Sequence, residues 1–182
     1  MVNAIVPIFT NIFSILAIVG QIIILLALAS VLIFRKKKNP LLIFGAKNGT
    51  LFALVVAVIA TSGSFFYSEV AGYQPCELCW FQRILMYPQV ILLSIAFVKK
   101  DKNIPNYLIP LSIIGMAIAA YHYILQLDLA PAACSAVGTS VSCSQINFLQ
   151  YGYITIPMMS LTAFSLIVLY MTVQKIYGKD IK

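Results

Sequence analysis

Four cysteines fall in two pairs along the chain, and the first pair has the spacing of a redox-active dithiol. Cys76 and Cys79 are separated by two residues, so a disulfide between them closes a ring of only four residues and constrains little chain. Such short pairs exchange disulfides, and at a helix N-terminus the backbone N–H groups stabilise the reacting thiolate. Arg83 follows Cys79 by four residues, which places its positive charge on the same helix face. The spacing therefore favours a redox pair over a structural staple.

The second pair, Cys134 and Cys143, is more widely spaced, and its role is open on spacing alone. Closing its loop of about ten residues would contribute slightly less than about 3 kcal/mol in a chain-entropy model, which is enough for a structural staple. A disulfide in a loop can equally take part in thiol exchange. Both interpretations are compatible with this spacing.

The composition indicates which elements must position these residues. Of the 182 residues, 62% are hydrophobic and only 9% are charged, whereas soluble domains carry roughly 25% charged residues. A helix crosses a bilayer with about 20 apolar residues, so we expect an all-α integral membrane protein. The first apolar segment lacks a basic residue before it and a cleavage site after it, so we interpret it as a retained helix. The five expected membrane helices are 12–34, 48–68, 80–99, 107–126 and 154–174.

The basic residues predict the orientation of these helices. Twelve Lys and Arg residues against five Asp and Glu give a net charge of +7, but they form no basic patch among polar residues, which argues against nucleic-acid binding. Eleven of the twelve follow the first, third or fifth helix, and cytoplasmic loops carry the excess of Lys and Arg. We therefore expect the N-terminus outside and the C-terminus in the cytoplasm. The eleven are Arg35, Lys36, Lys37, Lys38, Lys47, Lys99, Lys100, Lys102, Lys175, Lys179 and Lys182.

This orientation places all four cysteines in two loops on the outer face, 69–79 and 127–153. Thiols outside the cytoplasmic membrane meet an oxidising environment, so both pairs are expected to form disulfides. Arg83 is then the only base on the outer side, and His122, the only histidine, lies at nearly the same depth in the fourth helix. Gln126 follows His122 by four residues on the same helix face. A polar residue inside a membrane helix is a candidate for function.

Electrons that leave a dithiol need an acceptor, and the sequence carries no motif typical of haem, flavin or iron–sulfur binding. A quinone dissolved in the bilayer can reach the helix ends. Its carbonyl oxygen becomes negative on reduction, so Arg83 would stabilise this charge, while His122 or Gln126 would donate a hydrogen bond or a proton. These residues predict electron transfer from thiols to a membrane quinone.

The sequence resembles the DsbB family of disulfide bond formation proteins, in particular its BdbC-like branch. The resemblance extends over about residues 45–175 and rests on three features. They are Pro-Cys-Glu-Leu-Cys-Trp-Phe-Gln-Arg at 75–83, His-Tyr-Ile-Leu-Gln at 122–126, and the later pair Cys134 and Cys143.

The resemblance implies a role for each of these residues. Cys76 and Cys79 would be the pair oxidised by ubiquinone or menaquinone, with Cys79 the nearer one. Arg83 and His122 would belong to the quinone site. The location would be the bacterial cytoplasmic membrane.

The resemblance also implies a partner for the second pair. Cys134 and Cys143 would exchange with an exported thioredoxin-fold oxidase of the DsbA type, and the loop dithiol would then reduce the first pair. Segment 145–153 carries apolar residues among polar ones and is expected to lie along the membrane surface, which would bring the loop back over the first pair.

Two parts of the chain are expected. Residues 45–182 would form a four-helix membrane domain of the DsbB type with both redox loops. Residues 1–44 would add an N-terminal membrane helix and a basic cytoplasmic loop. The resemblance says nothing about this added helix, for which packing or partner binding are both possible roles.

Three other interpretations are open. The four thiolates could bind zinc or copper, with Met86, Met158 and Met159 as additional soft ligands. A purely structural membrane protein would use both disulfides as staples. A quinone reductase of the vitamin K epoxide reductase type is disfavoured, because its motif does not place an arginine four residues after such a pair.

Overall fold

The computed structural model describes residues 2–33, 40–129 and 142–178, and these ranges are almost entirely helical. Cys134 and the basic residues at 35–38, 179 and 182 lie outside the described residues. The described elements are α1 (Val2–Ile33), α2 (Pro40–Lys47), α3 (Gly49–Phe65), a π-helical turn η1 (Phe66–Val70), α4 (Glu77–Lys99), α5 (Pro105–Gln126) and α6 (Ile156–Tyr177).

Within the described ranges, five segments are long and apolar enough to cross a membrane. This confirms the expected all-α membrane fold of four helices and an added N-terminal helix. The five segments are Ile5–Ser30, Gly49–Val70, Glu77–Lys99, Pro105–Gln126 and Ile156–Tyr177.

Two helices begin earlier than their apolar runs predict. Hydropathy places the start of the third membrane helix at 80, but α4 begins at Glu77, whose carboxylate favours a helix N-terminus. The first was expected from 12, yet α1 begins at Val2. The polar residue Asn11 fits there because its Oδ1 accepts from Tyr151 Oη at 2.6 Å.

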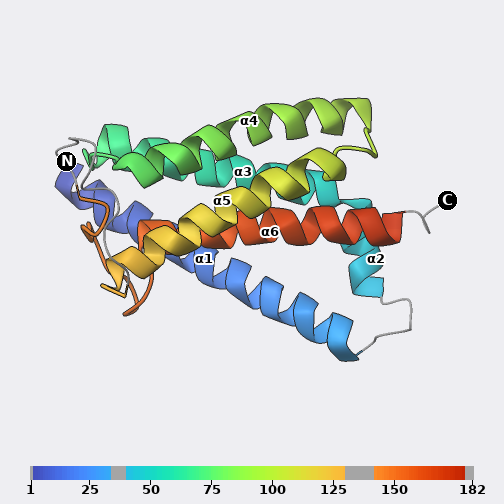
Figure 1. The fold of residues 1–182 in the computed structure, drawn as a ribbon, viewed down its shortest axis with the longest axis horizontal. Helices are drawn as coiled ribbons and strands as arrows, with labels where there is room; N and C mark the ends of the chain where they lie inside the picture. Colours follow the sequence, from blue (N-terminus) through green and yellow to red (C-terminus); the bar gives the residue numbers. More distant parts are fainter. Residues whose placement is uncertain (1, 34–39, 130–141, 179–182) are drawn as a thin grey trace.

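The helices α3, α4, α5 and α6 form a bundle, and α1 packs against α6 at its edge (Figure 1). The N-terminus, the α3–α4 connection and the α5–α6 connection gather at one end of the molecule. The α4–α5 connection and the C-terminus lie at the other end (Figure 1). Both segments with cysteines are therefore at the same end of the bundle.

Close contacts between α4, α5 and α6 hold the centre of this bundle. Gly115 of α5 faces the fully buried ring of Phe164 in α6, and any Cβ at this position would overlap with the ring. Three residues before Gly115, Ser112 Oγ donates to Gln89 Oε1 of α4 at 2.9 Å, and both side chains are fully buried. A buried hydrogen bond of this kind fixes the register of two helices in an apolar setting.

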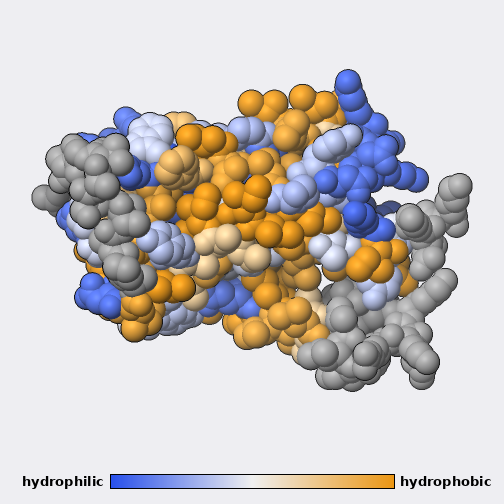
Figure 2. Space-filling view, in the orientation of Figure 1, coloured by the Kyte–Doolittle hydropathy of each residue, from blue (hydrophilic) through white to orange (hydrophobic). Residues whose placement is uncertain are grey.

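The outer surface of the helices is apolar over most of its length. Figure 2 shows a broad hydrophobic region across the middle of the molecule, with hydrophilic residues gathered at its ends. Large apolar side chains such as Leu25 and Ile91 are about two-thirds exposed, at 65% and 64%. Surfaces of this size are unfavourable in water, so they fit a multi-pass membrane protein whose helices face lipid.

Candidate active site

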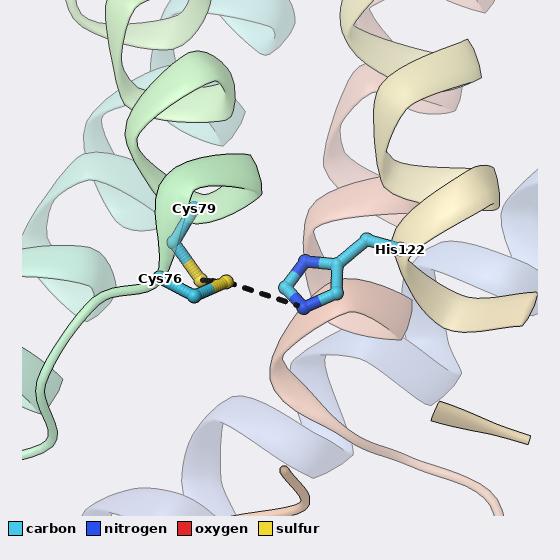
Figure 3. Close-up of side chains that lie close together, drawn as sticks. All are labelled: Cys76, Cys79 and His122. Carbon is cyan, nitrogen blue, oxygen red and sulfur yellow. Dashed lines mark hydrogen bonds between the residues drawn. The ribbon is translucent and has the colours of Figure 1, made fainter. Parts of the chain in front are cut away.

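Cys76 and Cys79 lie at the N-terminus of α4. Cys76 is the N-cap residue with an extended backbone, and Cys79 follows in the first turn, where the Trp80 N–H donates to the Cys76 carbonyl at 3.1 Å. The two sulfurs are 3.6 Å apart, so the pair is present as a dithiol within reach of bond formation. Figure 3 shows the two sulfurs facing each other, with His122 of α5 directed at Cys76.

His122 is buried, with 2% of its surface exposed, and its ring connects three segments. Its Nδ1 lies 3.1 Å from Gln82 Nε2 of α4. Because the amide nitrogen can only donate, Nδ1 accepts and Nε2 carries the ring proton. Nε2 then donates to the Cys143 carbonyl at 3.1 Å, and it lies 3.7 Å from Cys76 Sγ. His122 therefore holds the main chain of the second cysteine segment beside the first pair.

Cys143 itself packs against Cys76. Both are buried in one small cluster with Leu78 and Leu125, and the two thiols interact. The hydrogen bond with Cys79 and burial raise the pKa of Cys76 to about 12, while hydrogen bonds with His122 and Cys143 oppose part of this shift. Cys76 therefore keeps its proton at neutral pH in the dithiol state.

Arg83 is anchored to α3 on the other side of α4. Its Nε donates to Ser64 Oγ at 2.9 Å, and one terminal nitrogen donates to the Ser64 carbonyl at 3.1 Å. The guanidinium carbon lies 5.2 Å from the centre of the Trp80 ring, within range of a cation–π contact. Because a guanidinium has five N–H donors, these two bonds fix its position and leave donors for a ligand.

A cavity of about 290 Å³ lies beside Arg83 and Cys79, both of which line it. Gln82, Tyr67 and Tyr73 also line this end, and most of the remaining wall is apolar. A flat conjugated ring with polar carbonyl groups and an apolar tail fits such a lining, because the charge is confined to one end. A quinone is a molecule of this kind.

His122 and Gln126 do not line the cavity among its described residues. Gln126 is buried, and its Nε2 donates to the Gln145 carbonyl at 3.0 Å. The structure thus divides the residues that were predicted to form one quinone site. Arg83 lies at the cavity, whereas His122 and Gln126 bind the main chain of the segment around Cys143.

The segment that follows Cys143 returns over the cavity. The Phe148 ring lies 5.3 Å from the Tyr67 ring and 6.4 Å from the Tyr73 ring, measured between centroids. Asn147 contributes to the cavity lining. Segment 145–153 therefore covers the end of the bundle at which Cys76 and Cys79 lie.

Two residues of the site were missed by sequence reasoning. Gln82 positions His122, and Ser64 positions Arg83. Gln82 is a polar residue in an apolar helix, which is a usable signal. Ser64 gave no such signal, because serines in membrane helices commonly bond to their own helix, as Ser94 does with the Val90 carbonyl.

The metal-site interpretation requires four thiolates, which is more than the described residues bring together in one cluster. The ligand atoms of Cys76, Cys79 and His122 lie within 4.8 Å of one another. Of the two further thiolates of that hypothesis, Cys143 is not part of this group of ligand atoms, and Cys134 lies outside the described residues. Of the proposed soft ligands, Met86 lines the cavity, and Met159 Sδ accepts a hydrogen bond from Tyr67 Oη at 3.9 Å.

A helix bundle with a cysteine pair at the N-terminus of a membrane helix, a second cysteine beside it and an arginine-lined cavity defines a class of membrane thiol oxidoreductases. Residues 46–174 match the family model described as disulfide bond formation protein DsbB. The chain therefore belongs to the DsbB family.

Known relatives agree with this assignment and with its BdbC-like branch. The chain is 43% identical over 121 residues to the SPbeta prophage-derived disulfide bond formation protein B of Bacillus subtilis, covering 66% of this chain and 81% of the relative. It is 42% identical over 132 residues to disulfide bond formation protein C of the same organism, covering 71% and 96%. A probable disulfide formation protein of Coxiella burnetii is 37% identical over 136 residues, covering 74% and 92%. No solved structure matches the chain.

Proposed function

We propose that this protein reoxidises an exported, DsbA-like thioredoxin-fold oxidase and passes the electrons through two cysteine pairs to a membrane quinone, ubiquinone or menaquinone. This would support disulfide formation in exported proteins. The observation that carries the proposal is the placement of the first pair between two different surroundings. Cys76 packs against Cys143, and Cys79, which packs against the same cluster, also lines a cavity with Arg83.

The first stage transfers electrons from the partner to the loop pair. A thiolate of the reduced partner attacks Cys134 in the Cys134–Cys143 disulfide, which forms a mixed disulfide and releases Cys143 as a thiolate. The partner's second thiol then breaks the mixed disulfide, so the partner leaves oxidised and both loop cysteines are reduced. The burial of Cys143 beside Cys76 supports Cys134 as the cysteine that meets the partner.

The second stage moves the electrons to the first pair. The Cys143 thiolate attacks Cys76 in the Cys76–Cys79 disulfide, and Cys79 leaves as a thiolate. Cys134 then attacks Cys143, which restores the loop disulfide and releases Cys76. The released Cys76 takes a proton, in keeping with its raised pKa of about 12. His122 supports this stage because it holds the Cys143 carbonyl 3.1 Å from its ring nitrogen.

The last stage returns the first pair to its disulfide. When bound, a quinone supplies the acceptor for two electrons and two protons and leaves as quinol. Arg83, held by Ser64, would place a fixed positive charge where negative charge develops. Cys79 lines the same cavity, and Cys76 lies 3.6 Å from it, ready to close the disulfide.

The proposal includes the orientation expected from the basic residues. The cysteine-bearing end would face the outside of the bacterial cytoplasmic membrane, together with the N-terminus, and the C-terminus would face the cytoplasm. Both cysteine segments and the N-terminus lie at one end of the bundle, which supports this arrangement (Figure 1). Residues 45–182 would be the redox domain and residues 1–44 an addition to it.

A reconstituted reaction tests the proposal. Purified protein is mixed with a reduced thioredoxin-fold oxidase and a soluble quinone, and quinone absorbance is followed over time. The wild type should consume quinone only when the reduced oxidase is present. Cys79→Ser and Cys134→Ser should each abolish this consumption. Quinone loss that persists in both variants would overturn the relay.

A metal-binding role is the second candidate, because Cys76, Cys79 and His122 come close enough to share an ion. A bound metal would hold the thiols reduced. The relay instead predicts two intrachain disulfides in the protein as isolated from the membrane. Alkylation followed by intact mass measurement, with and without reductant, distinguishes these states, and metal analysis of the same sample provides the control.

A further inference from the structure

The wall of the cavity opposite the cysteines is formed in large part by α1. Six residues of this helix line the cavity, namely Phe13, Leu16, Ala17, Val19, Gly20 and Ile23. Phe13 and Ile23 are ten residues apart, so the lined stretch of α1 extends roughly 15 Å along the helix axis. The cavity is thus elongated along α1 and continues away from the end that holds Arg83.

The two ends of this cavity differ in chemistry. Arg83 is bonded to Ser64 of α3. Val56, eight residues before Ser64 in the same helix, also lines the cavity and lies roughly 12 Å from Ser64 along the helix axis. Ile23 and Leu166 accompany Val56 in the apolar part of the lining. The cavity therefore has a charged end beside Cys79 and a long apolar remainder.

The contacts that hold α1 in this position are specific. A Cβ at Gly20 would lie 2.8 Å from Leu166 Cδ1, so glycine permits the close approach of α1 to α6. Next to it, Gln21 Nε2 donates to Thr162 Oγ1 at 3.2 Å, and Gln21 Oε1 accepts from Tyr153 Oη at 2.8 Å. These polar bonds tie α1 both to α6 and to the segment that covers the site.

This helix lies outside the part of the chain that the family model matches, residues 46–174. Disulfide bond formation protein C of Bacillus subtilis is covered over 96% of its length by a match of 132 residues, close to the length of that region. Little of that relative is left to supply a counterpart of the 32-residue α1. Without α1, this side of the cavity would open directly to lipid.

We infer that α1 converts a lipid-facing groove of the DsbB-type bundle into a partly enclosed channel for the isoprenoid tail of the quinone. The inference rests on the proposed function, because it assumes that the ring binds at Arg83 and Cys79. The apolar lining of α1, α3 and α6 takes the tail, and this binding holds the ring at the charged end. Ala17, Gly20 and Ile23 are then specificity-determining residues that favour quinones with a long tail.

The test uses Trp80, the only tryptophan of the chain, which lies 5.2 Å from the Arg83 guanidinium. Its fluorescence is quenched by a quinone ring bound nearby, so binding is measured without turnover. The protein in lipid nanodiscs is titrated with a long-chain menaquinone and with menadione, which has the same ring and no tail. The variant Ala17→Phe fills the channel, and Ala27→Phe makes the same change at a position of α1 that does not line the cavity.

The expected result is a change in relative affinity. Ala17→Phe should weaken binding of long-chain menaquinone about tenfold or more relative to menadione, because the tail loses its apolar contacts. Ala27→Phe should leave the ratio of the two affinities as in the wild type. Ile23→Phe, a smaller change of volume in the same lining, should shift the ratio in the same direction and guards against misfolding of Ala17→Phe.

Other outcomes distinguish failure of the tail channel from failure of the quinone site. Equal affinities of the two quinones in the wild type, or an unchanged ratio in both cavity variants, would overturn the channel while leaving the quinone site in place. Failure of either quinone to quench Trp80 in the wild type would overturn the quinone site as well as the channel.

Discussion

The two sides of the cysteine pair at the N-terminus of α4 are built in contrasting ways. On one side, Cys76 is enclosed with Cys143 and His122, and hydrogen bonds join three segments. On the other side, Cys79 faces a mostly apolar cavity whose charged group, Arg83, is held in place by Ser64 of α3. A packed, hydrogen-bonded side suits exchange between sulfurs of the same chain, whereas a cavity suits a ligand that enters and leaves.

The contrast shows how two residues of one short motif can have different roles. At the N-terminus of α4 both sulfurs lie 3.6 Å apart against the cluster that holds Cys143, but of the two cysteines Cys79 is the one that also lines the cavity. Electrons can therefore enter at one sulfur and leave from the other. The variants below alter one side at a time, so they test whether the two sides are functionally separate.

The largest effect is expected from replacing the two cysteines one at a time. Both Cys76→Ser and Cys79→Ser should abolish turnover. In Cys79→Ser, the remaining Cys76 thiol can attack Cys143 of the loop disulfide, so a Cys76–Cys143 disulfide should accumulate and Cys134 should become a thiol. Cys76→Ser should give much less of the corresponding bond, because Cys79 packs only at the margin of the cluster that holds Cys143 and also lines the cavity.

Peptide mapping by mass spectrometry without reductant measures this difference. A cross-linked peptide that joins residues 76 and 143 should be abundant in Cys79→Ser, and one that joins residues 79 and 143 should be much rarer in Cys76→Ser. If both variants form a cross-link to Cys143 in similar yield, the two sulfurs are equivalent and the separation of the two sides is wrong.

The next largest effect is expected at Arg83. Arg83→Gln removes the fixed charge from the cavity and should slow quinone reduction by the chemically reduced protein about 100-fold. Oxidation of the partner by the loop disulfide, measured in a single turnover without quinone, should keep its wild-type rate. Arg83→Lys should recover only part of the quinone step, because an ammonium cannot make both bonds to Ser64 in the same geometry.

A smaller effect is expected at His122, on electron transfer between the two cysteine pairs rather than on quinone reduction. His122→Ala leaves Gln82 and the Cys143 carbonyl without their partner, so the second cysteine segment is held less firmly beside Cys76. Transfer of electrons from the loop pair to the first pair should slow about tenfold, since roughly 1.4 kcal/mol of positioning is lost. Quinone reduction by the chemically reduced protein should change little. A slow quinone step with a normal transfer step would place His122 at the cavity instead.

The fold was predictable from the sequence, because long apolar runs and clustered basic residues are strong signals for membrane helices. The helix starts were less so, since Asn11 is a polar residue whose partner, Tyr151, is supplied by the tertiary structure, and Glu77 lies before the apolar run of its helix. The candidate residues were also identifiable from their types. The sequence did not predict that these residues form two separate groups, because it places Arg83 and His122 at a similar depth in the membrane. Only the packing of α3 and of the segment around Gln145 separates them.

A last difference between the two sulfurs concerns the acidity of Cys76 rather than a rate of electron transfer. Its hydrogen bond with Cys79 is the largest cause that raises its pKa to about 12, so reduced wild-type protein should alkylate slowly at this residue at pH 8. Cys79→Ala removes that bond, and the pKa of Cys76 should fall toward its usual value. A lower pKa means more thiolate at pH 8, so alkylation of Cys76 should accelerate at least about tenfold. Mass-spectrometric rates from pH 7 to 10 measure the shift, with denatured protein as the control. Superimposable pH profiles for Cys76 in the two folded proteins would show that burial, rather than its partner across the motif, sets its acidity.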